Sequence, residues 1–250
     1  MNISGNTIFL PGGTSGIGLG LAQRFAAAGN TVIVGGRRRE LLDQISRDNP
    51  GIEGIYIDTA DAQSIVDVSA EVQRRWPATN VLVAMAGIMR PENLHSADFL
   101  AAAEATVTTN LLGPLRLIAA FSSFLAGQQD AAIVTVSSGL AFTPLAHTPT
   151  YNATKAAIHS FTEILRLQLA DKSVQVIELV PPAVQTEMLG QSSATNPHAM
   201  PLDAFLTEVM GLLASEPDAH EILVDSVKPL RFAAVNGTYD QVVGMLAALH

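Results

Sequence analysis

The chain has 250 residues, of which 48% are hydrophobic and only 15% are charged. This composition excludes a disordered chain and supplies a sizeable core, and the length fits one large α/β domain or two small ones. The net charge of −9 makes nucleic acid and anionic membranes poor partners, and the absence of cysteine excludes disulfides, zinc thiolate sites and cysteine nucleophiles.

Neither a membrane-spanning segment nor a targeting segment is evident in the sequence. No run reaches the roughly 18 uncharged apolar residues that a membrane helix requires. Met1–Asn6 has no basic segment of the kind that opens a signal peptide. We therefore expect a cytoplasmic protein with no membrane partner.

Short apolar runs alternate with longer helical patterns along the chain. The runs predict strands at Thr7–Leu10, Thr31–Val34, Ile55–Ile57, Val81–Ala84, Ile133–Val136 and Val174–Val180. The helical patterns lie at Gly16–Ala28, Arg38–Arg47, Ala62–Arg75, Ala97–Phe124, Asn152–Ala170 and Leu202–Ala214. We predict an α/β fold with a single Rossmann-like, doubly wound parallel sheet and helices on both faces. It covers residues 1–250 as one domain, with 187–216 as a substrate-side loop and helix inserted into it.

A glycine-rich loop follows the first predicted strand and leads into a helix. Glycines let the backbone turn sharply and approach a ligand closely, and the start of the helix offers free N–H groups to an anion. We predict that this loop binds a dinucleotide through Gly12, Thr14, Ser15, Gly16, Ile17 and Gly18. A glycine-rich turn without a ligand remains the alternative. A nucleoside-triphosphate loop is disfavoured because no Gly-Lys-Ser/Thr follows.

The second predicted strand ends in three arginines, with no acidic residue before Glu40. In a dinucleotide fold this strand end reaches the adenosine ribose, where an acid suits NAD and an arginine suits the 2′-phosphate of NADP. We therefore predict that Arg37 and Arg38 favour NADP(H) over NAD(H), with a solvated basic helix start as the alternative. Asp58, after the third strand, is predicted to contact the adenine, and a turn or N-cap role is equally open.

Tyr151 and Lys155 lie four residues apart, so on a helix a phenol and an ammonium share one face. A nearby cation favours the phenolate and lowers the pKa of a tyrosine from about 10, which suits a general acid/base at neutral pH. Ser138 stands just after the predicted strand Ile133–Val136. We predict that Ser138, Tyr151 and Lys155 are catalytic.

With these motifs the chain resembles the short-chain dehydrogenase/reductase family, and the sequence of residues 137–144 is similar to that of its DltE-like branch. The resemblance rests on Gly12-x-x-x-Gly16-x-Gly18, Asn110, Ser138, Tyr151-x-x-x-Lys155 and Pro181-Pro182-x-x-x-Thr186. It implies that Tyr151 exchanges a proton with the substrate oxygen, which Ser138 steadies. Lys155 would hold the nicotinamide ribose and lower the pKa of Tyr151. The remaining implied roles are a water carried by the catalytic Asn110, and cofactor contacts by Ala86, Gly87, Val184 and Thr186.

The sequence departs from the family pattern at two places. The family usually has Thr where Pro11 stands, and Asn-Asn-Ala-Gly where Ala84-Met85-Ala86-Gly87 stands. Both partners of a hydrogen bond between these motifs are therefore absent, a loss that can be nearly neutral. We predict a rewired contact between the first and fourth strands with activity retained. A cofactor-binding regulator without turnover is the alternative.

The residues expected beside the nicotinamide are mainly apolar. They are Gly139, Leu140, Phe142, Pro144, Leu145, Pro182, Ala183, Met188 and Leu189. This surface favours a largely apolar ketone or secondary alcohol as substrate. The histidines lack metal-ligand spacing, so no metal site is predicted. The sequence thus predicts an NADPH-dependent carbonyl reductase that runs reversibly as an alcohol dehydrogenase, with an NAD-dependent enzyme as the alternative.

The helices predicted at Ala97–Phe124 and Asn152–Ala170 are richer in apolar side chains than a solvated helix needs. In the family that the chain resembles, these two helices pair about a two-fold axis into a four-helix bundle. We therefore expect a homodimer or homotetramer. The alternative is a monomer whose own sheet covers every apolar helix face.

Overall fold

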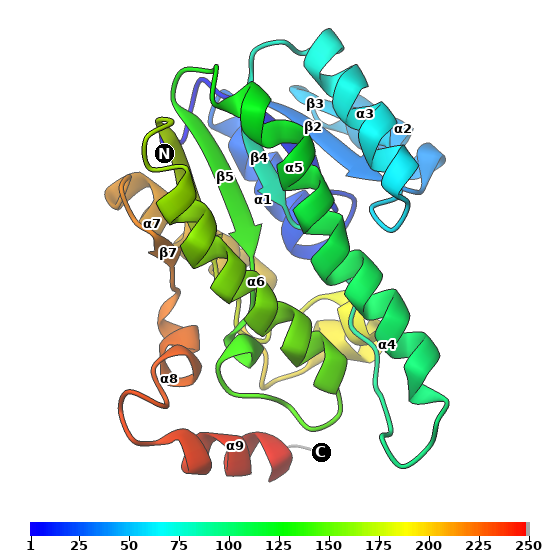
Figure 1. Cartoon of the computed structure of the whole chain (residues 1–250), viewed down its shortest axis with the longest axis vertical. Helices are drawn as coiled ribbons and strands as arrows, with labels where there is room; N and C mark the ends of the chain where they lie inside the picture. Colours follow the sequence, from blue (N-terminus) through cyan, green and yellow to red (C-terminus); the bar gives the residue numbers. More distant parts are fainter. Residues whose placement is uncertain (249–250) are drawn as a thin grey trace.

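The computed structural model describes residues 1–248, with the side chains of Leu189, Gln191 and Ser192 outside the description. Seven parallel strands form one sheet in the order β3-β2-β1-β4-β5-β6-β7. Their bounds are β1 Thr7–Pro11, β2 Thr31–Gly36, β3 Ile52–Tyr56, β4 Thr79–Ala84, β5 Ala131–Val136, β6 Val174–Leu179 and β7 Glu221–Ile222. The order reverses between β1 and β4, which confirms the predicted doubly wound sheet (Figure 1).

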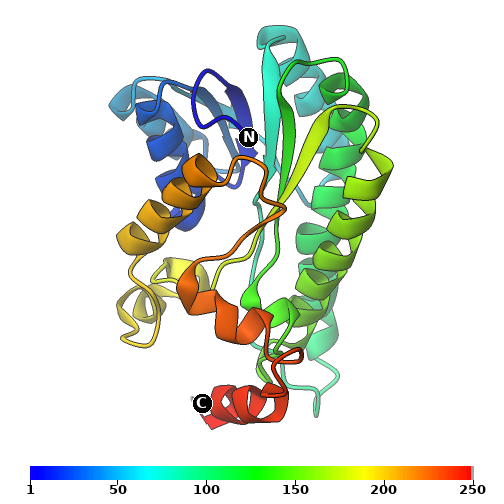
Figure 2. The same cartoon turned by 90° about the vertical axis from the view of Figure 1, so that its left-hand side faces the viewer.

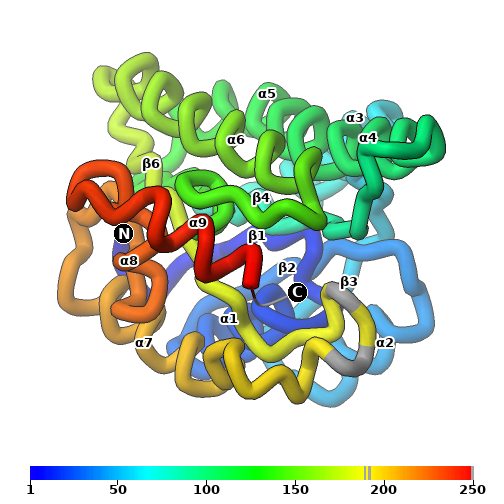
Figure 3. Tube along the Cα trace, turned by 90° about the horizontal axis from the view of Figure 1, so that it is seen from below, coloured from blue at the N-terminus to red at the C-terminus, as the bar shows by residue number. Residues whose placement is uncertain are grey.

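Helices cover both faces of this sheet, as predicted. The α-helices are α1 Gly16–Ala27, α2 Arg39–Asp48, α3 Ala62–Arg75, α4 Phe99–Val107, α5 Gly113–Leu125, α6 Pro149–Gln168, α7 Leu202–Ser215, α8 Lys228–Arg231 and α9 Tyr239–Ala248. Shorter helical turns are η1 Thr108–Leu112, η2 Gly139–Ala141, η3 Glu187–Leu189, η4 Gln191–Thr195 and η5 Asp225–Val227. Figure 3 shows α3 to α6 on one face and α1, α2 and α7 on the other.

Successive residues of the central strands alternate between two hydrophobic clusters. Ile8 and Leu10 of β1 pack toward α1 and α7, whereas Phe9 between them packs toward α3 and α5. All three side chains are fully buried. The nearly unbroken apolar strands of the sequence therefore reflect burial on both faces.

The carboxyl ends of the strands all point to one end of the molecule. Figures 1 and 2 show α8 and α9 at that end, with α9 farthest from the sheet. Pro11 is the last residue of β1, as its missing N–H requires. The two-residue strand β7 and the helices α8 and α9 were not predicted, because these last elements are short and carry little periodicity.

The segment after β6 leaves the sheet and returns to it. Val184 and Met200 form an isolated parallel bridge, and the Met200 N–H donates to the Ala183 carbonyl oxygen at 2.8 Å. The helix α7 then packs beside α1. Among the described residues, no helix has the length and apolar character needed to cross a membrane.

Candidate active site

The glycine loop after β1 is packed too tightly to accept side chains at two positions. Gly12 has φ +93°, and a Cβ there would lie 2.8 Å from the Cα of Ala86. A Cβ on Gly18 would lie 2.2 Å from the carbonyl oxygen of Gly12. Ser15 is the N-cap residue of α1, yet its hydroxyl makes no capping bond. The loop therefore leaves the start of α1 open to an anion, and these residues fit a dinucleotide phosphate.

Two later loops lie against the glycine loop. The close approach of Gly12 to Ala86 joins the end of β1 to the segment after β4, where the sequence departs from the family pattern. A Cβ on Gly16 would lie 3.2 Å from Cγ2 of Thr186, the N-cap residue of η3. Ala86 and Thr186 thus border the loop, and their cofactor contacts stay a prediction.

The arginines after β2 lie beside the glycine loop. Nη2 of Arg38 donates to Oγ1 of Thr14 at 3.3 Å, and both side chains meet solvent. The Arg39 guanidinium stacks on the ring of Tyr56, 4.1 Å from its centroid. Arg37 is exposed at the same strand end. A cluster of this kind can receive a phosphate dianion through charge-assisted hydrogen bonds.

Asp58 lies two residues beyond the end of β3 and shapes a turn. Its Oδ1 accepts a hydrogen bond of 3.0 Å from the N–H of Ala60, while its own N–H donates to the Ser64 hydroxyl. The N-cap residue of α3 is Asp61, whose side chain accepts from the N–H of Gln63. The alternative of a turn residue is therefore what the contacts of Asp58 show, and its adenine contact stays a prediction.

Ser138, Tyr151 and Lys155 come together at the carboxyl end of β5. Tyr151 and Lys155 occupy one face of α6, and both side chains are buried. Nζ of Lys155 lies 5.6 Å from the Tyr151 ring centroid and donates to the carbonyl oxygen of Val136 at 2.8 Å. The Ser138 hydroxyl hydrogen-bonds with Tyr151 and also accepts from the N–H of Leu140 at 3.2 Å. This arrangement can hold a substrate oxygen between two hydroxyls.

The predicted lowering of the tyrosine pKa is wrong for this arrangement. Burial raises the pKa of Tyr151 to about 12, and the hydrogen bond with Ser138 offsets this only in part. Burial also lowers the pKa of Lys155 to about 8, against an opposing attraction from Glu178. Both shifts have one physical cause, because a low-dielectric interior disfavours each charged form.

Asn110 lies in η1, a π-helical turn between α4 and α5. Its Oδ1 accepts from the Ile88 N–H at 2.8 Å, and its Nδ2 donates to the Ile88 carbonyl oxygen at 2.7 Å. A Cβ on Gly87 would lie 3.4 Å from Oδ1 of Asn110 and 3.8 Å from Nζ of Lys155. Gly87 therefore lies against both Asn110 and the Lys155 ammonium. The predicted helix Ala97–Phe124 is interrupted at η1, and single π turns often mark functional sites.

The apolar residues expected beside the nicotinamide differ in how exposed they are and in what they contact. Leu145 is buried, and Met188 is half exposed. The Phe142 ring contacts the His159 ring edge-on at a centroid distance of 4.6 Å and lies 4.3 Å below the Arg231 guanidinium. Phe142 is therefore engaged by α6 and α8. Leu189 lies outside the described side chains.

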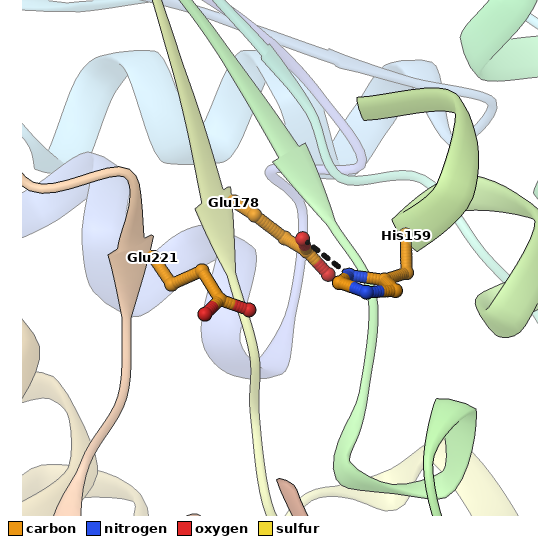
Figure 4. A group of neighbouring side chains, drawn as sticks. All are labelled: His159, Glu178 and Glu221. Atoms are coloured by element: carbon orange, nitrogen blue, oxygen red, sulfur yellow. Dashed lines mark hydrogen bonds and ion pairs between the residues drawn. The ribbon is translucent and has the colours of Figure 1, made fainter. Parts of the chain in front are cut away.

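Beside Phe142 lies a polar cluster that was not predicted from the sequence. Figure 4 shows Glu178 on β6 reaching His159 on α6, with Glu221 on β7 beside them. Ligand atoms of these three residues lie within 4.8 Å of one another. The signal was present in the sequence, since Glu178 is an acid inside an apolar strand and His159 follows Lys155 by one helical turn.

A separate cavity of about 540 Å³ lies at the opposite end of the sheet. It is lined by residues around the starts of the strands, including Met1, Asp130, Ser173 and Pro217, and by Arg166 near the end of α6. In open α/β sheets, ligands bind outside the carboxyl ends of the strands. This cavity lies instead at the starts of the strands, away from Tyr151 and the glycine loop.

Comparison with known proteins assigns the class that this fold and site define. The family profile described as short chain dehydrogenase matches residues 6–197. The chain belongs to this family of oxidoreductases. It is 41% identical over 187 residues to an uncharacterized oxidoreductase, DltE, of Bacillus subtilis (strain 168), covering 74% of each chain.

Two further relatives extend over nearly the whole chain. A farnesol dehydrogenase of Aedes aegypti is 25% identical over 237 residues, which covers 91% of this chain and 97% of that protein. The crystal structure of a short chain dehydrogenase from Burkholderia cenocepacia J2315 in complex with NADP is 26% identical, with a TM-score of 0.83. That match covers 97% of this chain and 99% of the other.

Proposed function

We propose that the chain is an NADPH-dependent carbonyl reductase, reversible as a secondary alcohol dehydrogenase, that acts on a largely apolar ketone or alcohol. One observation carries this proposal. Ser138, Tyr151 and Lys155 converge at the same end of the sheet as the open glycine loop and the arginines after β2. A hydride donor and a proton donor can therefore reach one substrate carbonyl.

Tyr151, Ser138 and Lys155 each have a separate role in the proposed reaction. A nicotinamide cofactor, when bound, supplies the hydride in reduction or accepts it in oxidation. Tyr151 donates its phenolic proton to the carbonyl oxygen in reduction and takes it back in oxidation. Ser138 donates a hydrogen bond to that oxygen, where negative charge develops. The Lys155 ammonium stabilises the phenolate that Tyr151 becomes when it has donated its proton.

The preference for NADPH rests on the arginines after β2. No acidic side chain precedes Glu40 there, so nothing at this strand end suits a ribose 2′-hydroxyl as a carboxylate would. Arg38 already lies on the loop residue Thr14, and Arg37 is exposed beside it. The NADP complex of the Burkholderia relative supports the same choice.

The substrate class rests on the apolar residues after β5 and β6. Leu140 and Met188 are partly exposed and offer hydrocarbon surface in the segments that follow these strands, which favours an uncharged substrate. The relative named farnesol dehydrogenase supports an alcohol as the substrate. The expected cytoplasmic location stays a prediction.

A panel of ketones and secondary alcohols, assayed with NADPH and with NADH, tests this function. We expect turnover of apolar members, with NADPH preferred. Preference for NADH would replace the cofactor assignment while leaving the reaction class intact. Tight binding of NADPH without turnover of any member would favour a cofactor-binding regulator. The departures from the family pattern at Pro11 and Met85 are the reason to consider this alternative.

A further inference from the structure

Glu178 is a carboxylate inside the sheet core. It lies on β6 opposite Thr135 of β5, on the face covered by α6, because the hydroxyls of Thr135 and Thr162 lie 2.8 Å apart. Its side chain is 1% exposed. Oε1 has no hydrogen-bond partner among the described residues. A buried carboxylate with an unpartnered oxygen is costly and calls for a compensating positive charge.

His159 compensates one side of this carboxylate. Its Nδ1 lies 2.8 Å from Oε2 of Glu178 (Figure 4). The hydrogen bond with Glu178 raises the pKa of His159. His159 follows Lys155 by four residues on α6, so both basic side chains lie on one face of the helix, Lys155 against Val136 of β5 and His159 against Glu178 of the neighbouring β6. Glu178 attracts the Lys155 ammonium as well.

The other charged groups around Glu178 are already paired or exposed. On α6, Glu163 is exposed and lies 4.0 Å from Nε2 of His159. On β7, both oxygens of Glu221 accept hydrogen bonds from Arg231, at 2.8 and 3.1 Å. Arg231 thus takes the place that a cation would need beside Glu221, which argues against a metal ion in this cluster.

We propose that Glu178, anchored by His159, is a positioning residue that supplies the negative charge opposing the buried Lys155 ammonium and so keeps that ammonium charged. This inference rests on the proposed function only for the use to which the charge is put, the stabilisation of the Tyr151 phenolate. The hydrogen bond of Glu178 with His159, one helical turn from Lys155, is independent of any substrate. Glu178 is 1% exposed and would act through Lys155 rather than by touching the substrate.

The physical need for such a charge follows from the surroundings of Lys155. Its side chain is 5% exposed, and its ammonium donates a hydrogen bond to the Val136 carbonyl oxygen. Burial already lowers the pKa of Lys155 to about 8, with Glu178 acting in the opposite direction. Without Glu178, the pKa of Lys155 would fall further, and the lysine would lose its proton near neutral pH.

A titration of the lysine side chains by ¹⁵N NMR tests the charge directly. The lysines of the chain are Lys155, Lys172 and Lys228, so the signals can be assigned with K172R and K228R variants. In Glu178→Gln we expect the Lys155 midpoint to fall by roughly one pH unit or more, as expected for the loss of a nearby charge in the interior. Glu178→Asp keeps the charge and should retain most of the original midpoint.

Glu163→Gln is the matched control, since it removes the same charge from the exposed end of the cluster. It should leave the Lys155 midpoint unchanged. An unfolded variant would move the midpoint up toward the usual lysine value, the direction opposite to the expected shift. An unchanged midpoint in folded Glu178→Gln overturns the proposal.

The pH dependence of ketone reduction tests the consequence for activity. The ratio of kcat for Glu178→Gln to wild type should be nearest to one at pH 6 and should fall as the pH rises. If the ratio does not change as the pH rises from 6, Glu178 has a merely structural role and the positioning role is overturned. If the wild type reduces no ketone while the Lys155 midpoint still shifts, the proposed function fails and the electrostatic role of Glu178 stands.

Discussion

Lys155 donates a hydrogen bond of 2.8 Å to the carbonyl oxygen of Val136, the last residue of β5. Ser138 follows Val136 by two residues, so this bond ties the helix that carries Tyr151 to the strand end that carries Ser138. The acceptor is main chain and cannot be removed by changing the side chain at position 136. The relative positions of Ser138, Tyr151 and Lys155 are therefore fixed by the sheet itself.

The phenolic hydroxyl of Tyr151 is the proton donor in the proposed reaction. We expect Tyr151→Phe to lower kcat by several orders of magnitude and to leave cofactor affinity nearly unchanged, because the ring remains and the proton is lost. Steady-state kinetics and a cofactor-binding titration measure the two effects. Tyr239→Phe removes a hydroxyl from α9 and should keep normal kcat. A Tyr151→Phe enzyme with more than a tenth of the wild-type kcat would refute the assignment.

Arg37 is expected to pair with the 2′-phosphate of NADPH. A charge-assisted hydrogen bond of this kind contributes roughly 1.5–3 kcal/mol. Arg37→Ala should therefore raise the Kd of NADPH about tenfold to a hundredfold and leave the Kd of NADH nearly unchanged. Arg39→Ala, which removes a neighbouring guanidinium stacked on Tyr56, provides the control. Equal losses for both cofactors would show that Arg37 does not read the phosphate.

The pair formed by His159 and Glu178 should make stability depend on pH. The hydrogen bond with Glu178 raises the pKa of His159 above its ordinary value of about 6.5. The stabilisation is complete below that ordinary value and is lost as the pH rises through the raised pKa.

We therefore expect wild type to exceed His159→Asn in free energy of unfolding by more at pH 6 than at pH 9. Asparagine keeps a donor near the position of Nδ1 but carries no charge, so it isolates the ionic part of the interaction. Urea unfolding at the two pH values measures the difference. A difference that does not change with pH would mean that His159 contributes only packing and a neutral hydrogen bond.

The strand ends were predictable because each chemistry-bearing motif directly follows an apolar run. The glycine loop, Ser138 and Thr186 could therefore be assigned to one edge of the sheet without coordinates. The π turn at Asn110 could not, since one extra residue per turn barely changes the apolar period of a long helix.

The predicted direction of the Tyr151 pKa shift was wrong for a related reason. A phenol and an ammonium at helical spacing indicate proximity, but burial depends on how η2 and α8 pack over the site, and the sequence pattern does not give this. Likewise, Glu178 could be recognised as an exception within its strand, whereas its partner His159 emerges only when α6 lies on β6.

The predicted homodimer or homotetramer depends on apolar side chains on the outer faces of α5 and α6. Ile118 and Leu165, which the sequence assigned to the apolar helix faces, are buried within the chain itself. Ile164 and Leu167 on α6 are 51% and 73% exposed, and Leu112 next to α5 is also exposed. Exposed aliphatic side chains on adjoining helices favour contact with a second copy of the chain.

We expect wild type to be a dimer or tetramer and Ile164→Glu/Leu167→Glu to be a folded monomer with reduced activity. Burying two carboxylates in a symmetric interface is costly, because each is repeated by the partner. Val66→Glu, an acid at an exposed valine of α3, is the control and should keep the assembly. Light scattering with circular dichroism separates dissociation from unfolding. A wild-type mass near 26 kDa with full activity at micromolar concentration would leave these side chains as ordinary exposed surface.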